Sequence, residues 1–187
     1  MEHALAHGVR VPRVFETRAS AIVMERVEGP TMLAHAATHP WQLWRQGRLL
    51  AALHEQLHAV PPLAGLPQPF AAGGSLLHWD LHPDNVLLSP NGPVIIDWSG
   101  ARNGPAGADV ARTWILIDTS EIPGSVAQRL TATAGRRFFL RAFLNRAGRG
   151  EARHFLREVG DERLQDTHLV GNEARAIRAL VAREAGT

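Results

Sequence analysis

The pattern of apolar and polar positions predicts a mainly helical chain that opens with two short strands. Residues 11–27 contain the segments VPRVFET and SAIVMERV, two apolar runs separated by a polar turn, which is typical of paired strands. Gly29 and Pro30 then break the chain. A helix is predicted over residues 41–59, and two prolines end it. Its apolar positions recur at helical spacing: Leu43, Leu50, Leu53 and Leu57.

The second half of the chain predicts a hairpin followed by helices. Residues 85–97, NVLLSPNGPVIID, form two apolar runs around a Ser-Pro-Asn-Gly turn, which favours a β-hairpin. Such a hairpin brings Asn85 and Asp97 back to one end. Further helices are expected from near Asp109 and at about 123–147, 150–168 and 172–185. Three glycines are candidate interruptions of these helices: Gly135, Gly148 and Gly171.

The segment HWDLHPDNVLL at 78–88 places polar groups where phosphoryl transfer needs them. A short loop between apolar strands can hold Asp80 at its tip, as the acceptor of a substrate hydroxyl proton. Asn85 and Asp97 offer an amide oxygen and a carboxylate, hard oxygen ligands that suit Mg²⁺ carrying nucleotide phosphates. These three residues are the candidate catalytic and metal-binding groups.

At these residues the sequence resembles the aminoglycoside phosphotransferase and choline kinase family, small-molecule kinases with the protein-kinase fold. Members carry H-G-D-x-x-x-x-N, then I-D-W or I-D-F, then D-x-A. The matching residues here are His78, Asp80, Asn85, Ile96-Asp97-Trp98 and Asp109-Val110-Ala111. The resemblance implies transfer of a phosphoryl group from ATP, with Mg²⁺, to a hydroxyl group of a small molecule.

The resemblance extends upstream to AIVMERVEGPTM at 21–32, which looks like the strand that ends in the hinge between the two lobes of the fold. In such a hinge the adenine would bond to the Glu25 carbonyl and the Val27 N–H, with Met24 behind the ring. This part of the resemblance assigns the nucleotide site.

The resemblance also assigns supporting residues. His78 would support the loop backbone by packing and hydrogen bonding, and His82 lies inside the loop, where it could touch substrate or phosphate. Asp109 would help to fix the catalytic loop. Trp79 and Asp84 stand where the family most often has glycines. A Trp beside the catalytic Asp is therefore expected to shape the acceptor pocket.

Two elements of the family are missing from the sequence. Kinases of this fold begin with a five-stranded lobe that has a Gly-rich loop and a Lys for the phosphates, but this chain has no Lys at all. We therefore expect a kinase-like α+β fold that is N-terminally truncated: residual N-lobe strands and hinge in 1–28, and a helical C-lobe in 29–187. A misplaced start codon, a truncated gene and a protein that no longer performs transfer remain open.

A rival motif is HEQLH at 54–58, which spells the H-E-x-x-H of zinc-dependent proteases. The prolines end its helix directly afterwards, and no clear third ligand follows at the usual spacing. The segment also resembles the family's L-A-x-L-H-x-x-P helix, in which His54 is a structural element. A zinc hydrolase is the remote alternative.

Composition narrows the class of protein. The 187 residues are 45% hydrophobic, enough for one domain with its own core, and no apolar run approaches the roughly 18 residues of a membrane span. The chain has no Cys and no signal-peptide pattern, so we expect a cytoplasmic protein. The pI near 10.7 reflects the absence of Lys and Tyr, because the net charge is only +2. No basic run or aromatic platform predicts nucleic-acid binding.

The preferred function is therefore a small-molecule O-phosphotransferase, and the alternative from another class is a non-catalytic kinase-like remnant that binds a partner. The acceptor and the oligomeric state stay open. A polycationic aminoglycoside demands an acidic cleft, and the Arg-rich C-terminal part argues against one. Acidic residues are nevertheless available there: Asp118, Glu121, Asp161, Glu162 and Asp166.

Overall fold

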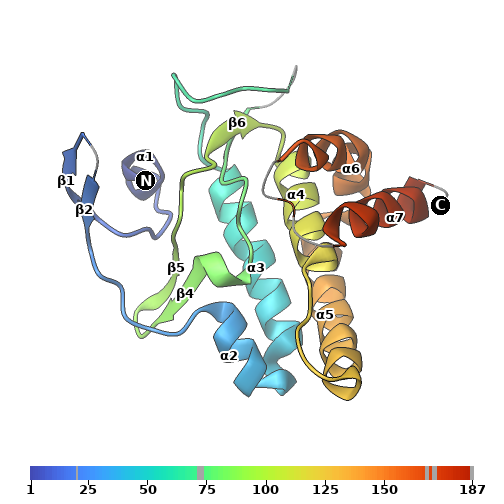
Figure 1. Cartoon of the computed structure of the whole chain (residues 1–187). Coiled ribbons are helices and arrows are strands. Elements are labelled where there is room, and N and C mark those ends of the chain that lie inside the picture. The colour runs from blue at the N-terminus through green and yellow to red at the C-terminus, as the bar shows by residue number, and fades with distance from the viewer. Residues whose placement is uncertain (20, 71–73, 167–168, 170–171, 186–187) are drawn as a thin grey trace.

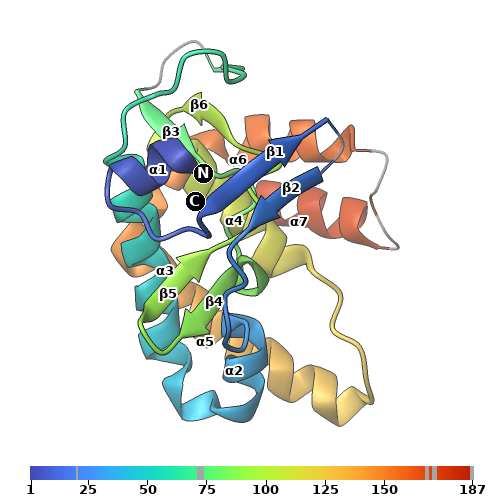
Figure 2. The same cartoon turned by 90° about the vertical axis from the view of Figure 1, so that its left-hand side faces the viewer.

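The computed structural model describes the chain except for residues 20, 71–73, 167–168, 170–171 and 186–187. After the short helix α1 (Glu2–Ala6), strands β1 (Val14–Arg18) and β2 (Ala21–Met24) pair in an antiparallel hairpin. Both strands are shorter than predicted, and their side chains are largely exposed. Figure 1 shows this hairpin on the opposite side of the molecule from the C-terminal helices, and in Figure 2 it lies in front of them.

The body of the fold is helical, as predicted. Its helices are α2 (Met32–Thr38), α3 (Leu43–His58), α4 (Ala106–Thr119), α5 (Val126–Ala147), α6 (Arg149–Leu164) and α7 (Glu173–Ala185), with a 3₁₀ turn η1 (Pro40–Gln42) before α3. Helix α3 packs along α5, and α4 packs along α6 (Figure 1). A Cβ at Gly47 would lie 2.4 Å from the Phe139 carbonyl oxygen, so α3 and α5 approach this closely only because the residue is Gly.

Three helical details differ from the sequence prediction. Helix α2 was not predicted; the Thr31 hydroxyl caps it by accepting a hydrogen bond of 3.1 Å from the Ala34 amide. Helix α4 begins at Ala106, three residues before Asp109. Gly135 lies inside α5 and does not interrupt it, because neighbouring residues continue the helical hydrogen bonds, whereas Gly148, with φ 94°, separates α5 from α6. Gly171 lies outside the described residues.

Two small sheets position the loop of interest. Strands β4 (Val86–Ser89) and β5 (Gly92–Ile95) form the predicted hairpin, with Val86 opposite Ile95 and Ser89 opposite Gly92. Strands β3 (Ser75–Leu77) and β6 (Arg102–Gly104) pair antiparallel, so the loop that follows β3 lies beside the segment that precedes β6. The second 3₁₀ turn, η2 (Pro83–Asn85), leads from this loop into β4.

One hydrophobic core joins the helices to the sheets. Its fully buried side chains include Leu50, Leu57, Leu77, Leu81, Ile95, Trp114, Ile115 and Phe143. Trp41, in η1, lies outside this core and is 73% exposed. Among the described residues, no helix is long and apolar enough to cross a membrane.

Candidate functional site

The loop after β3 is organised around His78, whose side chain is fully buried. Its Nε2 lies 3.0 Å from the Ile96 carbonyl oxygen, and its Nδ1 accepts a hydrogen bond of 3.3 Å from the Asp80 amide. Burial lowers the pKa of His78 despite the nearby Asp109 carboxylate, so the ring is neutral with its proton on Nε2. The imidazole thus ties the loop to the segment after β5.

The backbone at Trp79 is in the left-handed region, with φ 70°. Such a conformation is unfavourable for a non-glycine residue. Three hydrogen bonds surround it: the amides of His78 and Trp79 donate to the Asp109 carboxylate at 3.3 and 2.8 Å, and Arg112 Nε donates to the Trp79 carbonyl oxygen at 3.3 Å. The first two turns of α4 therefore hold the loop immediately before Asp80.

Asp109 is itself fully buried and accepts a hydrogen bond of 2.9 Å from His58 Nε2. Burial alone would raise the pKa of Asp109, but the hydrogen bond from His58 and the nearby His54 and His78 outweigh it and hold the pKa below its ordinary value. The carboxylate stays ionised and can accept from two backbone amides at once. This geometry is what the expected loop-fixing role of Asp109 requires.

Asp80 and Asn85 are in direct contact. The Asn85 amide nitrogen donates to both the carbonyl oxygen and the carboxylate of Asp80, at 2.8 and 2.9 Å. Burial would raise the pKa of Asp80, but His82, His78 and Arg112 outweigh it and lower the pKa. Asp80 is therefore an ionised acceptor at neutral pH, and no hydrogen bond to a described residue uses the Asn85 amide oxygen.

Asp97 lies at the same end of the β4–β5 hairpin as Asn85, because the Ile96 amide donates to the Asn85 carbonyl oxygen at 3.0 Å. Asp97 also has a positive φ, 57°, and its exposed carboxylate accepts a hydrogen bond of 2.7 Å from Ser99 Oγ. An unused amide oxygen and an exposed carboxylate at one hairpin end are a donor set that fits Mg²⁺.

His82 lies against the same two groups. Its Nε2 is 3.6 Å from the Asp80 carboxylate and 3.4 Å from the Asn85 amide nitrogen, and its Nδ1 accepts from the Asp84 amide at 3.3 Å. Asp84 in turn accepts a hydrogen bond of 2.9 Å from the Thr31 hydroxyl. The structure therefore brings His82 beside Asp80, and Asp84 connects the loop to α2.

The predicted hinge residues comprise the end of β2 and the segment that follows it. Met24 pairs with Val14, and the Glu25 amide donates to the Arg13 carbonyl oxygen at 2.8 Å. Within the described part of the chain, no hydrogen bond joins residues 24–27 to the loop at 78–85, and none uses the Glu25 carbonyl oxygen or the Val27 amide.

The rival H-E-x-x-H motif does find a third group in the structure, contrary to the sequence expectation. His54, His58 and Asp109 lie together, close enough in principle to hold a metal ion. However, Glu55, the general base of such a protease, points away and forms an exposed ion pair of 2.7 Å with Arg146. Asp109 is also occupied by the loop amides. The geometry therefore lacks the base that zinc-dependent hydrolysis needs.

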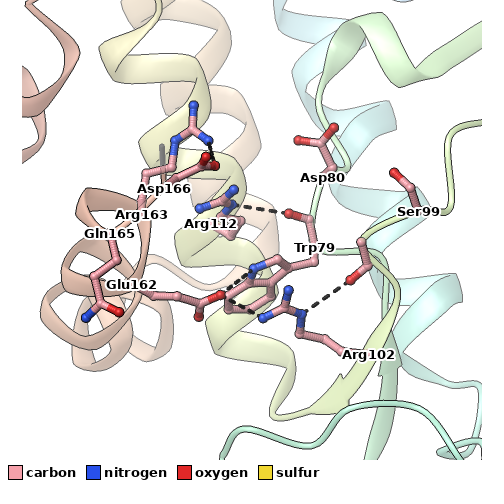
Figure 3. A pocket seen from close by; sticks show the side chains of 10 residues that line it. Trp79, Asp80, Ser99, Arg102, Arg112, Glu162, Arg163, Gln165 and Asp166 are labelled. Atoms are coloured by element: carbon pink, nitrogen blue, oxygen red, sulfur yellow. Dashed lines mark hydrogen bonds and ion pairs between the residues drawn. The ribbon is translucent and has the colours of Figure 1, made fainter. Parts of the chain in front are cut away.

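A cavity of about 470 Å³ opens beside Asp80 (Figure 3). Three arginines line it, and they were missed by the sequence reasoning because they come from β6, α4 and α6, far apart along the chain. The available signal was the position of Arg112 directly after D-x-A. The lining residues are Trp79, Asp80, Ser99, Gly100, Arg102, Arg112, Glu162, Arg163, Gln165 and Asp166.

Comparison with known proteins gives a family match. A sequence model described as the phosphotransferase enzyme family matches residues 63–155. These residues include the loop, the β4–β5 hairpin, the whole of α4 and α5, and the start of α6. No curated protein matches the sequence.

Solved structures share the fold at low sequence identity. A thermostable mutant of aminoglycoside phosphotransferase APH(4)-Ia, in its apo form, superposes with a TM-score of 0.62 and 16% identity, over 96% of this chain and 79% of that chain. A choline/ethanolamine kinase family protein from Mesorhizobium loti superposes with a TM-score of 0.51 and 15% identity, over 99% of this chain and 76% of that chain. A glucosamine kinase superposes with a TM-score of 0.50 and 15% identity, over 99% of this chain and 68% of that chain.

These matches confirm the predicted kinase-like fold, mostly helical and with a small N-terminal sheet. They also agree with the resemblance that the loop and hairpin motifs carry. Residues 63–155 thus match the phosphotransferase enzyme family, and the chain has the kinase-like fold of the solved structures.

Proposed function

We propose that the protein transfers the γ-phosphoryl group of ATP to a hydroxyl group of a small molecule. The observation that carries this proposal is the contact between Asn85 and Asp80. The Asn85 amide nitrogen holds the Asp80 carboxylate, and its amide oxygen is left for a metal ion beside Asp97. One side chain thereby connects the acceptor side of the site to the metal side.

In this proposal the Asp80 carboxylate accepts a hydrogen bond from the acceptor hydroxyl and orients it. The oxygen–phosphorus bond to the acceptor forms as the bond from the γ-phosphorus to the bridging oxygen breaks, and ADP leaves with that electron pair. The hydroxyl proton passes to Asp80 and then to solvent. The lowered pKa makes Asp80 a weak base, which suits a loose transition state that depends on positioning.

Asn85 and Asp97 would hold Mg²⁺, which neutralises charge on the nucleotide phosphates when bound. The Asp97 carboxylate accepts a hydrogen bond from Ser99 Oγ, and the Asp97 backbone is in the left-handed region. The Glu25 carbonyl oxygen and the Val27 amide are the groups we assign to the adenine, with Met24 beside the ring. In this assignment residues 1–28 supply the nucleotide hinge and residues 29–187 supply the chemistry, and the dependence on ATP fits the cytoplasm.

A second candidate function is a kinase-like binding protein without transfer activity. The observation that favours it is the absence of Lys from the sequence, because kinases of this fold hold the α- and β-phosphates with a Lys. The two candidates differ in one measurable property, the consumption of ATP.

The test is ADP formation from Mg-ATP by the purified chain, with water or a mixture of hydroxyl compounds as acceptors. We expect Asp80→Ala and Asp97→Ala each to lower the rate at least about a hundredfold. Asp161→Ala, a change of an exposed acid on α6, is the matched control and should leave the rate unchanged. Activity that survives either of the first two changes contradicts the assignment, and a wild-type protein that forms no ADP supports the second candidate.

A further inference from the structure

Arg112 differs from the other two arginines of the cavity in its partners. Arg102 pairs with Glu162 at 2.8 Å, and Arg163 pairs with both Asp166 and Glu173. Arg112 is only 8% exposed, yet no carboxylate of a described residue lies within 4.0 Å of its guanidinium group. Its one hydrogen bond to a described residue runs from Nε to the Trp79 carbonyl oxygen.

The Arg112 Cζ lies 5.8 Å from the centroid of the Trp79 ring, but no described carboxylate forms an ion pair with this buried cation, and burial of such a charge is costly. Burial lowers the pKa of Arg112, and the nearby Arg163 lowers it further. A guanidinium group nevertheless stays charged in proteins, so this charge has to be compensated in another way. Since Nε is used by Trp79, the two Nη groups are the donors that remain.

The surroundings of Arg112 show which way these donors face. The charges that act on it most are those of Arg163, Glu162, Asp80 and Arg102, all of which line the cavity. Figure 3 shows the guanidinium group between Asp80 and the side chains at the end of α6. The donors of Arg112 therefore point into the cavity where the proposed function places the acceptor.

We propose that this cavity takes a small acceptor that carries an anionic group, a carboxylate or a phosphate, in addition to its hydroxyl, and that Arg112 binds the anionic group. The proposal rests on the proposed function for the place of the hydroxyl at Asp80. The planar guanidinium fork matches both kinds of anion with two parallel hydrogen bonds. Such a ligand would give Arg112 the ion pair that no described carboxylate provides.

A polycationic acceptor fits this cavity poorly. Glu162 and Asp166 line it, but they are already paired with Arg102 and Arg163. A cationic ligand would have to break these pairs and would also be repelled by Arg112. Outside the cavity, Asp118 pairs with Arg183 at 3.1 Å. Three of the acidic residues that the sequence offered, Asp118, Glu162 and Asp166, are thus paired with arginines and do not form an acidic cleft.

The test on the wild-type protein is equilibrium binding in the absence of nucleotide, measured by calorimetry and by the thermal unfolding midpoint. The probes are glycerol, glycerate, glycerol phosphate and choline, which share a hydroxyl and differ in charge. We expect glycerate, glycerol phosphate or both to bind at least about tenfold more tightly than glycerol and choline. The two anionic probes also distinguish carboxylate from phosphate. Failure of both to bind, or preference for choline, overturns the proposal.

Variants then assign the binding to Arg112. Arg112→Gln should abolish the preference for the anionic probe, and Arg112→Lys should retain part of it, because Lys keeps the charge and loses the fork. Arg136→Gln is the matched control: Arg136 is a partly buried arginine that donates to the Ile117 and Ser120 carbonyl oxygens, outside the cavity.

Undiminished anion binding by folded Arg112→Gln contradicts the assignment. A second result would also contradict it: Arg112→Gln lowers the phosphoryl transfer rate equally with every acceptor and leaves anion binding unchanged. Arg112 would then act on the transferred phosphoryl group and not on the acceptor. Anion binding is measured without ATP, so its outcome does not depend on the outcome of the Asp97→Ala activity test. If Arg112→Gln does not fold, the comparison of the four probes on the wild-type protein still decides.

Discussion

The backbone amide of Trp79 donates a hydrogen bond of 2.8 Å to the Asp109 carboxylate, and this bond holds the residue before Asp80 at a φ of 70°. The family most often has Gly at this position, where a positive φ has no steric cost. Here a Trp occupies it with 3% of its surface exposed, and the Arg102 guanidinium lies 4.2 Å from the ring centroid. Packing therefore compensates for an unfavourable backbone.

This balance makes Trp79→Gly a direct test. Gly relieves about 1–2 kcal/mol of backbone strain, but removing a buried Trp side chain costs about 3–5 kcal/mol. We expect the free energy of unfolding, measured in urea, to fall by about 1–4 kcal/mol. The exposed Trp41 provides the control, since Trp41→Gly should cost no more than about 1 kcal/mol. A Trp79→Gly protein as stable as the wild type would show that strain outweighs packing.

Stability should also decrease in mild acid because of His54. Burial lowers the pKa of this fully buried imidazole from 6.5 to about 3. Above pH 6.5 the ring is neutral in both folded and unfolded chains, and below it only the unfolded chain takes up a proton. Acid therefore stabilises the unfolded state relative to the folded state. Through His54, the free energy of unfolding should fall by about 2 kcal/mol between about pH 7 and about pH 5.

The measurement is a series of urea unfolding curves over this pH interval. His54→Gln should flatten the dependence on pH, whereas His154→Gln, which changes an exposed histidine on α6, should leave the slope as it is. The comparison concerns slopes, because His54→Gln also changes the stability at neutral pH. An unchanged slope in His54→Gln would mean that His54 is not kept neutral by burial.

Zinc should play no part in the activity. Glu55 faces outward in an exposed ion pair with Arg146, so Glu55→Gln should leave any activity unchanged and alter the free energy of unfolding by less than about 1 kcal/mol. Elemental analysis of the purified protein should find no stoichiometric zinc. One zinc per chain, together with loss of a hydrolytic activity in Glu55→Gln, would reverse this conclusion in favour of the metal site at His54, His58 and Asp109.

The 187-residue chain should bind Mg-ATP weakly. Its residues before the hinge include a single glycine, Gly8, and no Lys, so the phosphates have little besides the proposed metal ligands to hold them. We expect calorimetry to detect binding weaker than about micromolar, which corresponds to less than about 8 kcal/mol. Asp97→Ala should abolish what binding there is. Submicromolar binding by this chain would show that other groups hold the phosphates.

The local sequence is sufficient to predict the β4–β5 hairpin and the relative positions of the polar residues in the loop before it. The apolar runs on either side of the Ser89–Gly92 turn predict β4 and β5, and pairing of these strands necessarily returns Asp97 to the end where Asn85 lies. The spacing of five residues between Asp80 and Asn85 likewise allows their direct contact. These features depend on neighbours in the chain, so local pattern determines them.

Tertiary structure decided the rest of the site. The sequence contains Asp109, but only the packing of α4 against the loop places its carboxylate at the Trp79 amide, and only the burial of Asp109 makes that bond strong. The cavity depends on β6, α4 and α6 meeting beside Asp80. Whether an arginine there is paired or unpaired follows from distances between residues some fifty positions apart, such as Arg112 and Glu162, and no local pattern contains those distances.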